Sequence, residues 1–340
     1  MENNVENIPP NTSQTIHTCT FQTRGKQRFS LGTTSVLAEN IEAVDTLQDI
    51  LELLFKTWTV FGVSTLFNFY QEEVYLKQYA KRLREEVANS LTKEDVAYNT
   101  KFLVMESISL RPSPMDPPPL KIEVYAKRRN NEESLNKCIY EGIFLSWRTT
   151  KNVLTTANSV RLPLLLCRGT KSAMRSVHNV LSRMFDCMII ALPIQEDDLI
   201  WLVPIVITPI NEQQPKSTDE IHMEYKIPEL PNTDTITIKF PILDLIKILK
   251  IIVKNQSDEA STEIFLSSEH IEQFRDVLYS QILDVAGLQL GFCTLYKINH
   301  PALTIMENRM KVMKTDAMNR VLLYLNEKAL DTLHTLSSEV

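Results

Sequence analysis

The side chains that could bind a metal or attack a substrate are scattered along this chain rather than clustered. Its six histidines contain no pair three or four residues apart, and its five cysteines contain no C-x-x-C pair. A zinc site takes clustered His, Cys or carboxylate ligands, and a disulfide framework takes an even set of cysteines. The sequence therefore predicts neither a metal site nor a disulfide framework. The cysteines are Cys19, Cys138, Cys167, Cys187 and Cys293.

One stretch, Gly169-Thr170-Lys171-Ser172, resembles the end of a phosphate-binding loop between a strand and a helix. That loop has the pattern G-x-x-x-x-G-K-[ST], because its second glycine lets the backbone wrap the phosphate. Here Thr170 separates the glycine from the lysine, and position 164 is leucine. We expect no nucleotide cofactor and no other cofactor.

Candidate nucleophiles, bases and acids are also weak. There is no G-x-S-x-G, and Cys187 lies in an apolar run, where a thiol behaves as a small hydrophobic group. His178 shares a helix face with Arg175 and Arg183, which indicates a surface or hydrogen-bonded histidine. The acidic residues 196–198 are typical of an exposed turn. We therefore expect a protein that is not an enzyme, against the alternative of an intracellular enzyme or nucleic-acid-binding adaptor with a dispersed site.

Composition is globular: 340 residues, 44% hydrophobic and 23% charged, with a net charge of −6. The balance argues against binding nucleic acid over the whole surface. The most apolar predicted helix, 242–253, carries three charges and is shorter than the roughly 20 residues that span a bilayer. With no signal-peptide pattern at the N-terminus, we expect a soluble intracellular protein with no membrane partner.

The stretch 160–193 is the clearest structural unit. An apolar run at 160–166 predicts a buried strand, and Thr170 can cap a helix whose apolar residues recur every three or four positions. A second apolar run, 187–193, predicts another strand.

Alternation of apolar and polar residues in 120–127 predicts a strand, and the segments 101–110 and 137–147 predict two more that pair with it in antiparallel order. We also predict a strand at 199–207, placed at a sheet edge or bulge because proline lacks a ladder amide.

These elements predict an α+β fold with largely antiparallel sheets and packed helices. Residues 1–43 are polar and predicted to be disordered. Residues 44–210 and 211–340 are predicted to be two α+β halves of one continuous unit. Within the tail, residues 23–35 hold three basic residues, no acid and several hydroxyls. This segment is either a solvated tail or a basic anchor or phosphorylation region.

Two surfaces remain as candidate partner sites. Residues 288–298 alternate in the longest strand pattern of the chain, which could form either a sheet edge that accepts a partner strand or an internal core strand. Basic residues are the second candidate, for DNA or an acidic partner, although a solvated loop is the default for the first three. The predicted partner-binding residues are Leu288, Leu290, Phe292, Thr294, Tyr296 and Ile298. The basic candidates are Lys127, Arg128, Arg129, Arg309, Lys311 and Lys314.

Several blocks, in order along the chain, resemble the centromere protein L family of the inner kinetochore. The segment Lys56-x-Trp58-Thr59 is similar to the family's KxWT pattern, and the segment from Leu162 to Gly169 is similar to its most recognisable block. The other matching residues are Leu66, Phe67, Phe69, Phe185, Asp186, Cys187, Leu199, Trp201, Val321, Leu322, Tyr324 and Leu325.

The resemblance implies a non-enzymatic scaffold at the centromere and kinetochore of the nucleus. Proteins of this family pair with centromere protein N through their C-terminal sheets, which would put the dimerisation sheet in residues 211–340. The pair contacts centromere protein C and the H, I, K and M subunits and lies near centromeric nucleosome DNA. Without its partner, such a chain could pair with itself through the same edge.

Overall fold

The fold is α+β with antiparallel sheets, as the sequence predicts. The computed structural model describes residues 28–30, 50–91, 95–105, 116–128, 136–147, 155–156, 158–208, 215–229, 231, 234–254 and 265–338. The helices described are α2 (Glu73–Leu91), α3 (Lys171–Met184), α4 (Glu196–Ile207), α5 (Ile242–Lys254), α6 (Ser268–Ala286), α7 (Thr315–Ser338) and the short 3-10 helix η2 (Leu290–Phe292).

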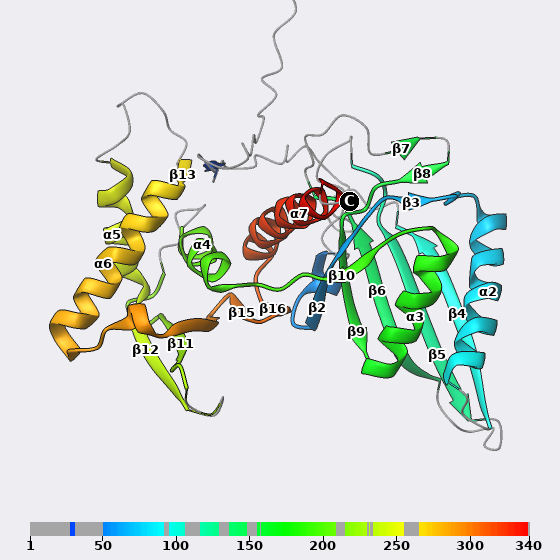
Figure 1. Cartoon of the computed structure of the whole chain (residues 1–340), viewed down its shortest axis with the longest axis horizontal. Helices are drawn as coiled ribbons and strands as arrows, with labels where there is room; N and C mark the ends of the chain where they lie inside the picture. The colour runs from blue at the N-terminus through cyan, green and yellow to red at the C-terminus, as the bar shows by residue number, and fades with distance from the viewer. Residues whose placement is uncertain are drawn as a thin grey trace, which may run out of the picture.

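One 11-stranded sheet runs through the molecule in the order β12-β11-β14-β15-β16-β2-β9-β6-β5-β4, with β10 also paired to β2. Figure 1 shows its N-terminal strands beside α2 and α3, and its C-terminal strands beside α4 to α7. Its strands are β2 (Thr57–Val63), β4 (Val96–Val104), β5 (Leu120–Arg128), β6 (Lys137–Leu145), β9 (Leu164–Gly169), β10 (Ile189–Ala191), β11 (Glu220–Lys226), β12 (Thr235–Pro241), β14 (Thr294–His300), β15 (Leu303–Met306) and β16 (Arg309–Val312).

Two smaller sheets flank the main one. One pairs β3 (Leu66–Phe67), β8 (Ser159–Val160) and β7 (Thr155–Thr156), and the other pairs β1 (Arg28–Ser30) with β13 (Phe265–Ser267). The second pair includes three residues, Arg28–Ser30, of the tail 1–43 that is predicted to be disordered. The rest of that tail lies outside the described residues.

Strand β2 joins the two predicted halves. Thr59 lies beside Arg309 of β16, and Val60 lies beside Leu166 of β9. Apolar side chains on one face of the N-terminal strands pack under α2 and α3, whereas Trp58 and Val60 on the opposite face share a core with α4 to α7. Because successive side chains of a strand point to opposite faces, the apolar side chains of β2 contribute to both cores.

The predicted unit at 160–193 is present as β9, α3 and β10. The Thr170 hydroxyl accepts a hydrogen bond from the Ala173 amide at 3.3 Å and so caps α3. Gly169 has a φ of +152°, and a β-carbon there would collide with the carbonyl oxygen of Ile139. The glycine therefore serves a close strand contact and a left-handed backbone, not a phosphate loop.

The predicted strand at 199–207 is wrong, because these residues form most of helix α4. The acidic residues 196–198, predicted to be an exposed turn, are the first turn of this helix. The Asp198 carboxylate accepts a hydrogen bond from the Gln195 amide at 2.7 Å, which completes a capping box. A continuous apolar run is compatible with a buried helix as well as a buried strand, and only packing decides.

Candidate interaction surfaces and a buried charge network

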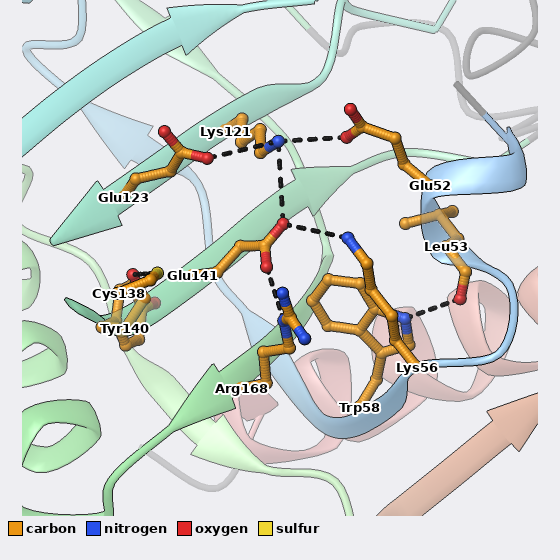
Figure 2. A network of polar contacts seen from close by, with 10 residues as sticks. All are labelled: Glu52, Leu53, Lys56, Trp58, Lys121, Glu123, Cys138, Tyr140, Glu141 and Arg168. Atoms are coloured by element: carbon orange, nitrogen blue, oxygen red, sulfur yellow. Dashed lines mark hydrogen bonds and ion pairs between the residues drawn. The ribbon is translucent and has the colours of Figure 1, made fainter. Parts of the chain in front are cut away.

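A polar cluster connects strands β5, β6 and β9 with the segment that precedes β2 (Figure 2). Its centre is Glu141 of β6, whose side chain is only 5% exposed. The carboxylate accepts a hydrogen bond from Arg168 Nε of β9 at 2.5 Å. Lys56 Nζ and Lys121 Nζ lie 3.5 and 3.6 Å from it. Three cations thus surround one nearly buried carboxylate.

Lys121 extends the network to a short helical turn at residues 50–53, which precedes β2. Its ammonium lies 3.0 Å from Glu52 and 3.3 Å from Glu123. Burial alone would lower the pKa of Lys121, but the hydrogen bond that it donates to Glu52 and the nearby carboxylates outweigh this effect and raise the pKa. The lysine therefore stays charged and ties β5 to the turn before β2.

The Trp58 ring packs beneath two cations of this cluster. Its indole nitrogen donates to the Leu53 carbonyl at 2.8 Å, and the Lys56 and Arg168 cations lie 5.7 and 5.8 Å from its ring centre. Both distances are within the range of cation–π attraction. The alternating pattern of β5 predicts that Lys121 and Glu123 lie on one face. Their neighbours Glu141 of β6 and Arg168 of β9 depend on the order of the strands in the sheet.

Replacing Glu141 by glutamine should lower the free energy of unfolding by about 2 kcal/mol at pH 7, because three cations lose their shared carboxylate. Burial raises the pKa of Glu141, but Arg168, Lys56 and Lys121 outweigh it, so that this pKa lies below its usual range. A carboxyl with a lowered pKa stabilises the fold above its unfolded-state pKa and loses that effect as the pH falls through the folded-state pKa.

Urea unfolding of wild type and E141Q at pH 7 and pH 3.5 measures this difference. We expect the gap in stability between the two proteins to shrink at the lower pH. Glu85→Gln on the exposed side of α2 is the matched control and should change stability by less than about 0.5 kcal/mol. A gap of the same size at both pH values would contradict the assigned role of Glu141.

The residues considered for chemistry are dispersed. His178, predicted to be a surface or hydrogen-bonded histidine, is instead buried on α3, with its ring 4.6 Å from that of Phe61. Burial lowers the pKa of His178 to about 4, so the imidazole is neutral at physiological pH.

Cys187 is buried, and burial raises the pKa of its thiol to about 12. Within the described ranges, no three metal-ligating side chains converge and no helix is apolar and long enough to cross a membrane.

The predicted strand at 288–298 is only partly correct. Residues 288 and 289 are irregular, Leu290 and Phe292 lie in η2, and β14 begins at Thr294. β14 pairs with β11 on one edge and β15 on the other. From Lys297 to Asn299 both edges are therefore occupied, so this part of the strand is internal and cannot accept a partner strand. The η2 helix does present Phe292, which is 73% exposed, while Leu290 is 1% exposed.

Among the residues that the structure describes, the open edge of the C-terminal strands is β12, for which the one paired neighbour is β11. Thr294 lies beside Lys226, and Lys226 lies beside Thr235, so η2 is at the same end of the sheet as the start of β12. We define the α6 tip as the exposed apolar residues Leu283, Val285, Leu288 and Phe292. An unpaired strand near exposed apolar side chains is typical of a protein–protein interface.

The basic candidates divide into two separate groups. Lys127 and Arg128 are at the end of β5, while Arg309 and Lys311 are on β16 and Lys314 follows it. Three strands, β2, β9 and β6, lie between β16 and β5. Arg129 lies outside the described residues. The structure therefore does not bring these six cations together at one site.

Three sequence blocks from distant parts of the chain meet at the centre of the molecule. Lys56 precedes β2 and Trp58 lies in it, next to the apolar block of β9. Buried residues of α7, among them Val321 and Leu325, pack in the same core as Trp58. A family model for centromere protein L matches residues 52–330, which include all three blocks. The chain belongs to the centromere protein L family.

Centromere protein L of Xenopus tropicalis is 24% identical to this chain over 302 residues, which cover 86% of this chain and 83% of the relative. Membership of the centromere protein L family makes this chain a centromere protein of the kinetochore and places it in the nucleus. Lys56 and Trp58, which carry part of the resemblance, also belong to the Glu141 network.

Proposed function

We propose that this chain is a non-enzymatic scaffold of the constitutive inner kinetochore that pairs with centromere protein N. In this role it helps to link centromeric chromatin to the kinetochore during chromosome segregation. The pair contacts centromere protein C and the H, I, K and M subunits and lies near centromeric nucleosome DNA. The family assignment supports this proposal.

The open edge of β12 is the observation that supports β12 as the pairing surface. A partner strand added there would extend the sheet by main-chain hydrogen bonds, and the α6 tip would supply apolar contacts. Ile236 and Ile238 of β12 pack toward the core, whereas Thr237 and Lys239 are exposed. The predicted site therefore moves from β14 to the neighbouring edge, and it keeps Leu288 and Phe292 from the original set.

The first test is the absolute mass of the purified chain, alone and co-expressed with centromere protein N of the same organism. We expect a stable one-to-one complex, with the lone chain self-pairing or aggregating. In the complex, the β12 amides that point away from β11 should gain protection from hydrogen exchange. A monomer that does not bind centromere protein N would refute this pairing surface. A complex in which hydrogen exchange of the β12 amides is unchanged would refute it as well.

Phe292→Glu should weaken binding of centromere protein N at least about tenfold, because a large exposed apolar contact is lost and a charge is buried in the interface. Its free energy of unfolding should change little, since the ring is exposed in the free chain. Leu290→Glu should instead unfold the chain, because this side chain is in the core. Isothermal titration and urea unfolding separate the two effects.

Leu103→Glu on β4 is the control, because it is the same kind of change at an apolar residue 45% exposed. It should leave binding intact. Equal binding by Phe292→Glu and wild type would remove the α6 tip from the interface.

We also propose that Arg309, Lys311 and Lys314 contact DNA or an acidic partner. All three are exposed, and none has a carboxylate within ion-pair distance in the part of the chain that the structure describes. Arg309→Glu with Lys311→Glu should weaken DNA binding and reduce its dependence on salt concentration. An unchanged salt titration would make this an ordinary solvated patch.

A further inference from the structure

The second edge of the main sheet is strand β4, at the opposite end from β12. In the part of the chain that the structure describes, β4 pairs with β5 alone, residue by residue from Val96 to Val104. The strand is 9 residues long, and its register has no bulge. It has no proline, and Lys101 is its only charged residue. Proline, several charges, a bulge or a short length usually protects an edge strand from pairing with other chains, so β4 is a long edge with little of that protection.

Helix α2 lies over one face of β4 and fixes its position, at the end of the sheet farthest from β12 (Figure 1). Tyr98, Thr100 and Phe102 are buried on that face, and the Thr100 hydroxyl donates a hydrogen bond to the Ala80 carbonyl of α2. The opposite face of β4 is open to solvent. Its exposed residues are Ala97, Asn99, Lys101 and Leu103. A strand added to β4 would therefore have α2 on one side and solvent on the other.

On the helical side of this edge, Arg84 is exposed and has no carboxylate within ion-pair distance among the described residues. Glu86 pairs with Arg183 of α3 at 2.6 Å, and this contact fixes which side of α2 faces α3. Arg84 is about 200° around the helix from Glu86, so it lies on the side away from α3. Since α3 lies over β6 and β9 while α2 lies over β4, that side is next to the β4 edge. The acid Glu73 is bound to Lys77 at 2.7 Å.

On the solvent side of the edge, Lys101 is a second cation without a carboxylate. Its ammonium lies 5.6 Å from the centre of the Tyr125 ring. Glu123 lies beside Lys101 in the register but is bound to Lys121 at 3.3 Å, so Lys101 has no ion-pair partner in the described ranges. A strand added to β4 would lie between Arg84 and Lys101. Carboxylates on the two faces of that strand would match the charge of both cations.

We propose that β4 accepts an extended acidic segment of a partner protein as an additional strand of the sheet. Main-chain hydrogen bonds to the open edge would supply affinity, and carboxylates that pair with Arg84 and Lys101 would select the segment. This surface is separate from the β12 edge proposed for centromere protein N, because the two strands are at opposite ends of the sheet. One chain could therefore bind both partners at once.

The test measures binding of two synthetic peptides to the full chain by fluorescence anisotropy. One peptide repeats Glu-Val-Thr over the length of β4, which puts carboxylates on both faces of a strand, and the other repeats Lys-Val-Thr. We expect the acidic peptide to bind at least about tenfold more tightly, because its carboxylates meet the two cations. The chain as a whole has a net charge of −6, so a general electrostatic effect would favour the basic peptide. The absence of a preference for the acidic peptide would overturn the proposal.

Charge-reversal variants show whether the two cations cause this preference. Arg84→Glu with Lys101→Glu should abolish it, because both pairing charges change sign. Lys171→Glu with Arg175→Glu on the exposed side of α3 makes the same change in net charge elsewhere and should leave the preference intact. Equal losses in the two double variants would overturn the proposal, because only the total charge would then matter.

Hydrogen exchange locates the bound peptide. The β4 amides that point away from β5 should exchange rapidly in the free chain and at least about tenfold more slowly with the acidic peptide bound, while the β15–β16 pair stays unchanged. Protection gained at β12 instead, or outward β4 amides that are already protected in the free chain, would overturn the proposal. Protection of β4 that rises with protein concentration alone would also overturn it, because the added strand would then come from a second copy of the chain.

Discussion

Replacing Asp198 by alanine is expected to lower the free energy of unfolding by about 3–5 kcal/mol. This carboxylate is nearly buried, and it joins the first turn of α4 to α7. One oxygen accepts from the Gln195 amide and from Lys328 Nζ, both at 2.7 Å, and the other accepts from the Tyr324 hydroxyl at 2.9 Å. Alanine would remove a helix cap and leave a lysine side chain only 20% exposed without its carboxylate.

Urea unfolding at pH 7 measures this loss. Asp197→Ala is the matched control: Asp197 is the exposed neighbour in the same first turn, and this change should cost no more than about 1 kcal/mol. The double variant D198A/K328M should recover part of the loss, because it removes the unpaired cation as well. Equal effects of D198A and D197A would show that Asp198 acts only through the helix dipole.

Replacing Arg320 by methionine is expected to lower the free energy of unfolding by about 3–4 kcal/mol, because a partly buried guanidinium completes the C-terminal end of α4. Arg320 of α7 donates to the carbonyl oxygens of Ile205, Val206 and Thr208. The Pro204 carbonyl accepts from the Thr208 amide and hydroxyl. Since the last carbonyls of a helix lack partners in the helix, one side chain from α7 supplies most of this cap.

Arg320→Lys tests the geometry of this cap. Burial lowers the pKa of Arg320 to about 10, which leaves it charged at neutral pH, and lysine would keep the charge. A single ammonium cannot match the planar fork of donors, so we expect an intermediate loss. Arg84→Met on the exposed face of α2 is the control and should be nearly neutral. A lysine variant as stable as wild type would show that only the charge matters.

Local patterns predicted the elements whose formation depends on near neighbours. The Thr170 cap with the period of α3, and the alternation of β5, each identified an element that is present. The alternation of β5 also predicts which of its side chains lie on the polar face. It does not predict their contacts with Glu141 and Arg168, because these depend on the order of β5, β6 and β9 in the sheet. Sequence alone does not specify which strands become neighbours.

The misassigned elements have a common physical cause. Residues 199–207 are apolar on all sides, and such a run suits a buried helix and a buried strand equally. Its identity is decided by Asp198 at one end and by Arg320, 112 residues after Thr208, at the other. His178 likewise shares its helix with exposed arginines but is buried against Phe61 of β2.

The sequence by itself determined the α+β class, the central strand–helix–strand unit and the resemblance to the centromere protein L family, since these depend on local period, capping and ordered blocks. Tertiary structure alone decided that β14 is internal, that β12 forms the open edge, and that Arg28–Ser30 pair with β13. A strand is at the edge of a sheet when no other strand pairs with it on one side. That property arises from long-range pairing over the whole sheet, and no local pattern encodes it.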